Sequence, residues 1–110
     1  MVKDYTLMID IKKYIEQVKK DVNINKVLLF GSYARNNATE NSDVDLAIIS
    51  EEFDKAPLLE KVKLYQLRHR ADIHYDIQPV PVGLDEYNNC TDFFIKEIRA
   101  TAIDLTDEIV

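Results

Sequence analysis

The sequence lacks long hydrophobic runs and has almost no cysteine, and each of these absences excludes a class of protein. No apolar run approaches the ~18 residues that a transmembrane helix needs. The first residues also lack the apolar stretch of a secretory signal peptide. The one cysteine, Cys90, cannot form a disulfide within the chain, which suits a reducing compartment. We therefore expect a cytoplasmic protein that does not enter a membrane.

Positive charge is also scarce. The chain has 14 Lys and Arg residues against 20 Asp and Glu residues, a formal net charge of −6, and no basic run longer than a pair. Proteins that hold long nucleic acids usually present a basic face, because neutralising phosphates supplies much of their affinity. Action on long DNA or RNA by this chain alone is therefore not expected. The acidic balance suits a small nucleotide that arrives with its own magnesium, or a basic protein partner.

The remaining pattern is that of one small globular domain, which we assign to residues 1–110. Hydrophobic spacing predicts three main helices, at residues 5–21, 57–69 and 92–101. It also predicts strands at residues 26–30, 43–50 and 73–80, with a short edge strand at 103–105. The expected fold class is mixed α/β, a small β-sheet with helices packed on it.

Two of these elements carry more detailed predictions. The second helix is expected to pack through an inner face made of Leu58, Leu59, Val62, Tyr65 and Leu67. The third strand is expected to stop at its prolines, Pro79 and Pro81. Alternation along that strand would put Asp76 and Gln78 on the same face.

The most informative pattern is a Gly-Ser turn followed, ten residues later, by two aspartates. Gly31 and Ser32 follow the first strand, and Asp43 and Asp45 open the second. Because side chains on a strand alternate between faces, the two carboxylates point the same way. Together they can hold a hard cation such as magnesium, which binds through one or two carboxylates plus substrate phosphates. The pattern therefore indicates a site for metal-assisted nucleotidyl transfer.

The residues around this pattern have predicted roles of their own. Residues 32–35 are expected to form the first turn of a short helix, whose free N–H groups would favour phosphate. Arg35 either reaches a phosphate or makes an ion pair with Asp43 or Glu40, and the sequence leaves both open. Ser42 is expected to orient its loop rather than to contact nucleotide.

The stretches Gly31-Ser32-Tyr33-Ala34-Arg35 and Ser42-Asp43-Val44-Asp45-Leu46 resemble the minimal nucleotidyltransferases of the DNA polymerase beta superfamily. The order of elements is similar over nearly the whole chain. One departure is Asn36, where the family commonly has glycine, but asparagine tolerates the left-handed conformation better than most residues. Such proteins are often encoded beside a helical HEPN-domain toxin. The resemblance implies a polymerase-beta-like nucleotidyltransferase fold.

The superfamily commonly carries a third carboxylate on a neighbouring strand. Asp76 is the stronger candidate, since it is predicted to lie in the middle of the third strand. Asp72 is the alternative, at the start of that strand, where capping or solvation is the simpler role.

The resemblance also implies a role for each site residue. Asp43 and Asp45 would hold the magnesium that binds the triphosphate. Asp76 would complete a second metal site or accept the proton of the nucleophile. Gly31, Ser32 and Arg35 would contact the nucleotide.

By the same resemblance, the expected activity is magnesium-dependent transfer of AMP from ATP to a hydroxyl group. The implied acceptor is a tyrosine of a HEPN toxin, and the protein would then be an antitoxin. One alternative is a binding module that neutralises its partner by masking it, without transfer. Another is nucleotidyl transfer to a small molecule, as in antibiotic-modifying relatives that carry an added helical domain. A site partly open to solvent would also suit a homodimer or a hetero-complex.

Overall fold

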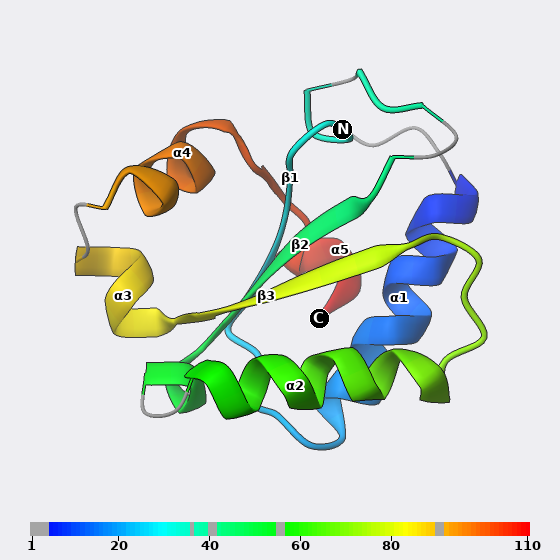
Figure 1. Cartoon of the computed structure of the whole chain (residues 1–110), viewed down its shortest axis with the longest axis horizontal. Helices are drawn as coiled ribbons and strands as arrows, with labels where there is room; N and C mark the ends of the chain where they lie inside the picture. Colours follow the sequence, from blue (N-terminus) through cyan, green and yellow to red (C-terminus); the bar gives the residue numbers. More distant parts are fainter. Residues whose placement is uncertain (1–4, 36, 40–41, 55–56, 90–91) are drawn as a thin grey trace.

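The computed structural model describes residues 5–35, 37–39, 42–54, 57–89 and 92–110, which form a four-stranded sheet with helices on both faces (Figure 1). The strands, in the spatial order β3-β2-β1-β4, are β3 (Ile77–Gly83), β2 (Val44–Ser50), β1 (Lys26–Phe30) and β4 (Ile103–Asp104). β2 is antiparallel to β1 and parallel to β3, and β4 is antiparallel to β1. The predicted mixed α/β fold class is therefore confirmed.

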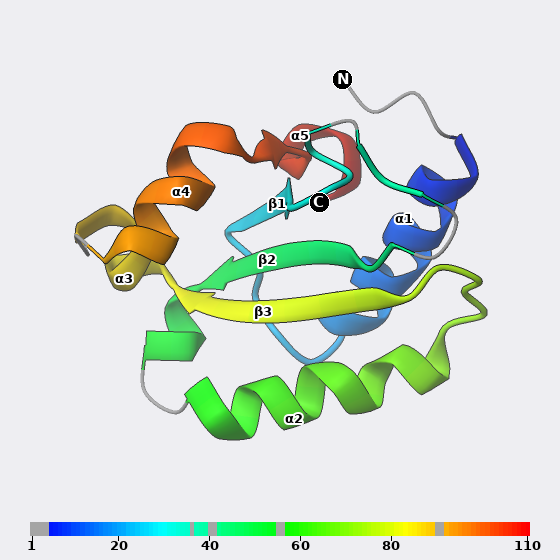
Figure 2. The ribbon, with the colours of Figure 1, turned by 45° about the horizontal axis from the view of Figure 1, so that its top comes forward.

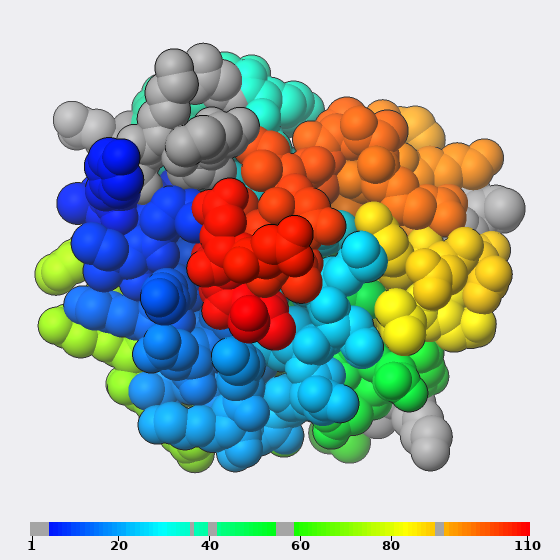
Figure 3. Space-filling view, turned by 180° about the vertical axis from the view of Figure 1, so that it is seen from behind, coloured from blue at the N-terminus to red at the C-terminus, as the bar shows by residue number. Residues whose placement is uncertain are grey.

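One face of the sheet, called here the closed face, is covered by α1 (Tyr5–Lys19), α2 (Pro57–Leu67) and α5 (Thr106–Ile109). Alternate residues of the central strand supply the sheet side of this core, where Val44, Leu46 and Ile48 are fully buried. The space-filling view from behind shows α5, in red, between α1 and the chain that leads into β1 (Figure 3). The closed face holds the larger of two hydrophobic clusters.

The opposite face, called here the open face, is covered by α3 (Leu84–Asn89) and α4 (Phe93–Thr101). Both helices gather at the end of the sheet where β2 and β3 finish (Figure 2). Their cluster is smaller, and its buried members are Leu28, Ala47, Ile49, Val82, Ile95 and Ile98. The helices leave the beginning of β2 and β3 uncovered on this face, where Asp45 and Gln78 are paired.

The predicted inner face of α2 is right for Leu67 but wrong for Leu59 and Val62. Leu64 and Leu67 are buried, whereas Leu59 is 75% exposed and Val62 is 55% exposed. The burial of Leu58 lies outside what the structure describes. The apolar residues of α2 are spread around more than one side of the helix, so spacing alone did not select the buried side. Packing against α1 selects it, and the Tyr14 hydroxyl there donates to the Leu64 carbonyl at 2.8 Å.

The third strand is displaced toward the C-terminus of the chain from its predicted range. It begins at Ile77 rather than at residue 73, and both Pro79 and Pro81 lie inside it rather than ending it. β3 is an edge strand, paired on one side only with β2. On a strand, the backbone nitrogens of residues two apart point to the same side. Both proline nitrogens can therefore point to the unpaired side, where no sheet hydrogen bond is lost.

The remaining predictions for the chain ends are close to the structure. α1 and α4 match their predicted ranges to within about two residues. The short strand at 103–105 is confirmed as β4, and α5 follows it without having been predicted. Two short 3₁₀ helices, η1 (Glu51–Asp54) and η2 (Arg68–Arg70), flank α2. Within the described residues, no helix is both long and apolar enough to span a membrane.

Candidate active site

The Gly-Ser turn has a backbone that requires glycine. Gly31 has a φ of +75°, in the left-handed region that L side chains rarely adopt. A Cβ at this position would also overlap the Asp45 carboxylate. The turn is closed by hydrogen bonds from the Arg35 N–H to the Gly31 carbonyl (3.2 Å) and from the Asn37 N–H to the Ser32 carbonyl (3.0 Å). Residues 31–35 form this turn rather than the predicted start of a short helix.

The two aspartates of the second strand lie next to this turn. Asp45 is half-buried on β2 and is paired in the sheet with Phe30 on β1 and with Gln78 on β3. Its neighbours Val44 and Leu46 point into the closed face, so alternation directs Asp45 to the open face. Asp43 is exposed and lies just before the strand. The carboxylate of Asp45 therefore lies directly against Gly31, as the sequence pattern predicts.

Asp76 reaches the pair from the loop that leads into β3. It lies one residue before the strand, not in its middle, so that part of the prediction is wrong. Its carbonyl accepts a hydrogen bond from the Val44 N–H at 2.8 Å, which places it beside the start of β2. Its carboxyl group is near enough to that of Asp43 to raise the pKa of Asp43. The alternative, Asp72, is exposed, and its carbonyl oxygen accepts from Lys13 Nζ at 3.3 Å on α1.

Three further side chains support Asp76, and the sequence analysis did not identify them as site residues. Gln78 Nε2 donates to Asp76 Oδ1 at 2.7 Å, and the Arg68 guanidinium lies 3.4 Å from the same oxygen. The Tyr65 hydroxyl donates to Gln78 Oε1 at 2.6 Å, and Arg68 lies over the Tyr65 ring, 5.2 Å from its centre. Gln78 could have been found from its position two residues after Asp76. Tyr65, on α2, and Arg68, at the start of η2, reach the site only through tertiary packing.

The surroundings of Asp43 and Asp45 raise the pKa of both carboxyl groups. The hydrogen bond with Asp76 raises the pKa of Asp43, desolvation and the charge of Asp76 act in the same direction, and Arg68 opposes them. Desolvation by burial raises the pKa of Asp45, the charge of Asp43 adds to this, and Arg35 opposes it. Carboxylates held together in this way are compensated when a cation binds between them.

The residues present fit a magnesium ion that arrives with its nucleotide. In the parts of the chain that the structure describes, no three His, Cys, Asp or Glu side chains are gathered closely enough to hold a metal by themselves. Magnesium commonly takes only one or two carboxylates and completes its shell with phosphate oxygens and water. Asp43 and Asp45 supply those carboxylates, and the absence of a side chain at Gly31 leaves room beside Asp45.

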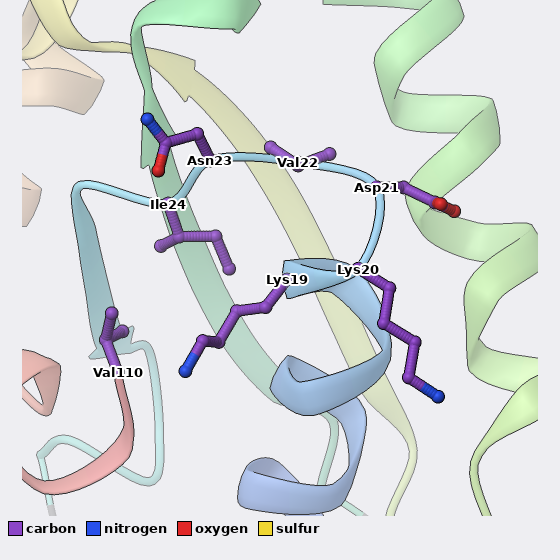
Figure 4. A pocket seen from close by; sticks show the side chains of 7 residues that line it. All are labelled: Lys19, Lys20, Asp21, Val22, Asn23, Ile24 and Val110. Atoms are coloured by element: carbon purple, nitrogen blue, oxygen red, sulfur yellow. The ribbon is translucent and has the colours of Figure 1, made fainter.

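A cavity of about 210 Å³ adjoins the Gly31 turn on the side of α4. The rings of Phe30 and Phe94 meet edge to face within it, with their centres 5.7 Å apart. It is lined by Phe30, Gly31, Arg35, Phe94, Glu97, Ile98 and Thr101. A second hollow, of about 320 Å³, lies at the C-terminal end of α1 (Figure 4). That hollow shares no lining residue with the carboxylate site.

The other residues with predicted roles have simpler surroundings. Arg35 is exposed and takes part in none of the ion pairs between described residues, while Glu40 lies outside the described residues. The Ser42 hydroxyl accepts a hydrogen bond from the Thr39 N–H at 2.8 Å, so Ser42 does shape its loop.

Comparison with known proteins identifies the family to which the chain belongs. The nucleotidyltransferase domain family matches residues 11–105, which is most of the chain. The chain belongs to this family, and the protein is a nucleotidyltransferase. The resemblance to nucleotidyltransferases that the sequence motifs indicate is therefore confirmed.

Individual relatives and one solved structure agree with this assignment. Two Methanocaldococcus jannaschii proteins are each named "Putative protein adenylyltransferase". One is 37% identical over 79 residues, covering 66% of this chain and 78% of its own length. The other is 33% identical over 87 residues, covering 79% and 81%. A crystal structure of a "putative nucleotidyltransferase" from Sulfolobus solfataricus superposes with a TM-score of 0.64 at 16% identity, over 98% of this chain and 94% of that one, and shows the same fold.

Proposed function

We propose that the protein transfers AMP from ATP to a hydroxyl group of another protein, with magnesium as the cofactor. The observation that carries this proposal is the Asp45 carboxylate lying against Gly31, with Asp43 and Asp76 beside the start of β2. The names of the Methanocaldococcus relatives support a protein acceptor and an adenylyl group.

Each residue has a distinct role in this reaction. Asp43 and Asp45 would hold the magnesium, which when bound neutralises charge on the triphosphate. The turn at Gly31 brings backbone close to the phosphates, and the Ser32 hydroxyl donates a hydrogen bond to one of their oxygens. The acceptor oxygen attacks the α-phosphorus, the bond to the β-phosphate oxygen breaks, and pyrophosphate leaves. Asp76 would complete a second metal site beside Asp43, and its other carboxylate oxygen would accept the proton of the attacking hydroxyl.

For the acceptor, we propose a tyrosine of a HEPN-type toxin, which makes this protein an antitoxin. This part rests on the resemblance to minimal nucleotidyltransferases and on the acidic net charge of −6, which suits a basic protein partner. The test is incubation with the toxin, ATP and magnesium, followed by mass spectrometry. An AMP adduct on a toxin tyrosine is expected. Stoichiometric inhibition without ATP, and without the adduct, would support masking instead.

The nucleotide site is tested without any acceptor by titrating ATP into the protein calorimetrically, with magnesium and then with EDTA. Binding is expected only with magnesium, and Asp43→Asn/Asp45→Asn should weaken it by about 100-fold or more, because both metal ligands lose their charge. The control is Asp104→Asn, which removes a carboxylate paired with Lys26 at the β4 edge. Equal binding by wild type and the double variant would refute the assignment.

A further inference from the structure

Helix α1 carries a buried carboxylate that the proposed mechanism does not use. Asp10 is only 2% exposed and lies in a row of fully buried apolar residues that includes Leu7, Ile11 and Tyr14. Burying a carboxylate is costly unless hydrogen bonds compensate for the lost water. Asp10 Oδ2 receives two, from the His74 N–H at 2.6 Å and from the Tyr75 N–H at 2.9 Å. The buried charge therefore binds the backbone immediately before Asp76.

The loop that leads to Asp76 lies along α1 and is held there at successive points. Lys13 Nζ donates to the Asp72 carbonyl, Asp10 accepts from residues 74 and 75, and the Thr6 hydroxyl contacts the Tyr75 hydroxyl at 2.9 Å. β3 begins only at Ile77, so these N–H groups are not fixed by a sheet ladder. The position of this segment is therefore set by α1.

The same segment also touches the rest of the site. The Tyr75 ring meets the Tyr33 ring of the Gly-Ser turn edge to face, with centres 6.2 Å apart. The Asp76 carbonyl accepts from the Val44 N–H, between Asp43 and Asp45 in the sequence. A shift of the backbone at residues 74–75 would thus move the third carboxylate relative to the other two.

We propose that Asp10 is a positioning residue, which holds Asp76 beside the start of β2 by fixing the backbone of His74 and Tyr75. The inference rests on the proposed function, because it assumes that Asp76 serves the nucleotidyl-transfer site. A charged oxygen suits this task, since hydrogen bonds to an ionised acceptor are shorter and stronger than those to a neutral one. An apolar side chain at this position would leave two N–H groups without an acceptor and release the loop.

The test compares Asp10→Ala and Asp10→Asn with a matched control, Tyr14→Phe. The control removes another buried hydrogen bond of α1, which runs to the Leu64 carbonyl on α2 rather than to the loop. The first readout is hydrogen exchange of the Val44 amide. This amide donates to the Asp76 carbonyl, so its exchange rate reports whether that hydrogen bond is kept, and it is remote from Asp10 itself. Asp10→Ala should speed this exchange by about 10-fold or more beyond any change in global stability. Tyr14→Phe should change it only in step with global stability.

The second readout is the affinity for Mn²⁺ in the presence of ATP. Asp10→Ala should lower it by about 10- to 100-fold, as is typical for residues that orient metal ligands. Asp10→Asn should lower it less, because its amide oxygen still accepts from both N–H groups. In the Asp76→Asn background, Asp10→Ala should cause little further loss, because both changes act through the same carboxylate.

The outcomes separate this inference from the proposed function. Two results would overturn the role of Asp10 alone. One is an unchanged exchange rate at Val44 in Asp10→Ala. The other is a loss of Mn²⁺ affinity in the Asp10→Ala/Asp76→Asn variant that equals the sum of the two single losses in free energy. If the Asp76→Asn variant binds Mn²⁺ as tightly as wild type does, then the assignment of Asp76 to the metal site and the role of Asp10 are both refuted. The Asp43→Asn/Asp45→Asn titration would still decide the nucleotide site by itself.

Discussion

The two faces of the sheet differ in how completely helices cover them. On the closed face, α1, α2 and α5 bury every residue that β2 directs toward them. On the open face, α3 and α4 cover Ala47 and Ile49 toward the end of β2, but Asp45 at the start of the strand is only half-buried. One strand therefore serves as core on one side and as site on the other.

The difference shows how a small domain combines stability with chemistry. A carboxylate that binds a hydrated metal and a nucleotide needs access to solvent, whereas a core needs water to be excluded. Alternation of side chains along β2 satisfies both needs within seven residues. The larger core on the closed face compensates for the uncovered area on the open one.

The comparison predicts a large difference between core truncations on the two faces. Ile48→Ala, on the closed face, should lower the free energy of unfolding by about 3 kcal/mol, because a fully buried side chain leaves a cavity. Val80→Ala, on the open face, should cost about 1 kcal/mol or less, because Val80 is only partly buried. Urea denaturation measures both. Equal losses would show that the two faces contribute alike to stability.

Gly31→Ala is expected to damage both stability and the site. The backbone strain and the overlap with Asp45 should cost about 1–3 kcal/mol of unfolding free energy. Affinity for magnesium and ATP should fall by about 10-fold or more, because Asp45 must move. The control is Gly83→Ala, where a Cβ would overlap the Asp54 carboxylate at the far end of β3. The control should lose stability but keep nucleotide affinity, as measured by denaturation and calorimetry.

Removing either of two tyrosine hydroxyls should have a smaller effect on stability and gives a more closely matched comparison of the two faces. Tyr14→Phe removes a hydrogen bond within the closed face, and Tyr65→Phe removes the one to Gln78 beside Asp76. Each should cost about 1 kcal/mol of unfolding free energy. Only Tyr65→Phe should also weaken Mn²⁺ binding in the presence of ATP, by a few-fold. A loss of binding in Tyr14→Phe would mean that the two faces are coupled.

The smallest expected effect is a dependence of stability on pH. The pKa of Asp43 is raised in the folded state, so folding takes up protons there, and this contribution is lost as pH rises through the raised pKa. In EDTA at neutral pH, Asp43→Asn should therefore raise the Tm slightly, and the gain should vanish in acid below the ordinary carboxyl pKa. Thermal unfolding across pH measures this. A lower Tm for the variant at neutral pH would contradict it.

Sequence patterns predicted most of the fold and the centre of the site for local reasons. Gly31 was identifiable because a Gly-Ser turn directly follows the first apolar strand, and Asp43 and Asp45 because their spacing matches strand alternation. The order of strands and helices followed from hydrophobic runs in the same way. The buried side of α2 and the start of β3 were mispredicted, since both depend on which neighbours a segment packs against.

The sequence by itself determined that the Gly-Ser turn and two carboxylates would lie side by side, because both depend on residues within one hairpin. Only the tertiary structure decided which aspartate joins them. Asp76 is brought in by Asp10 and Lys13 on α1 and is supported by Arg68 and Tyr65 around α2. These partners are tens of residues away along the chain, and no local pattern marks them. Their meeting depends on helix packing, which hydrophobic spacing constrains but does not fix.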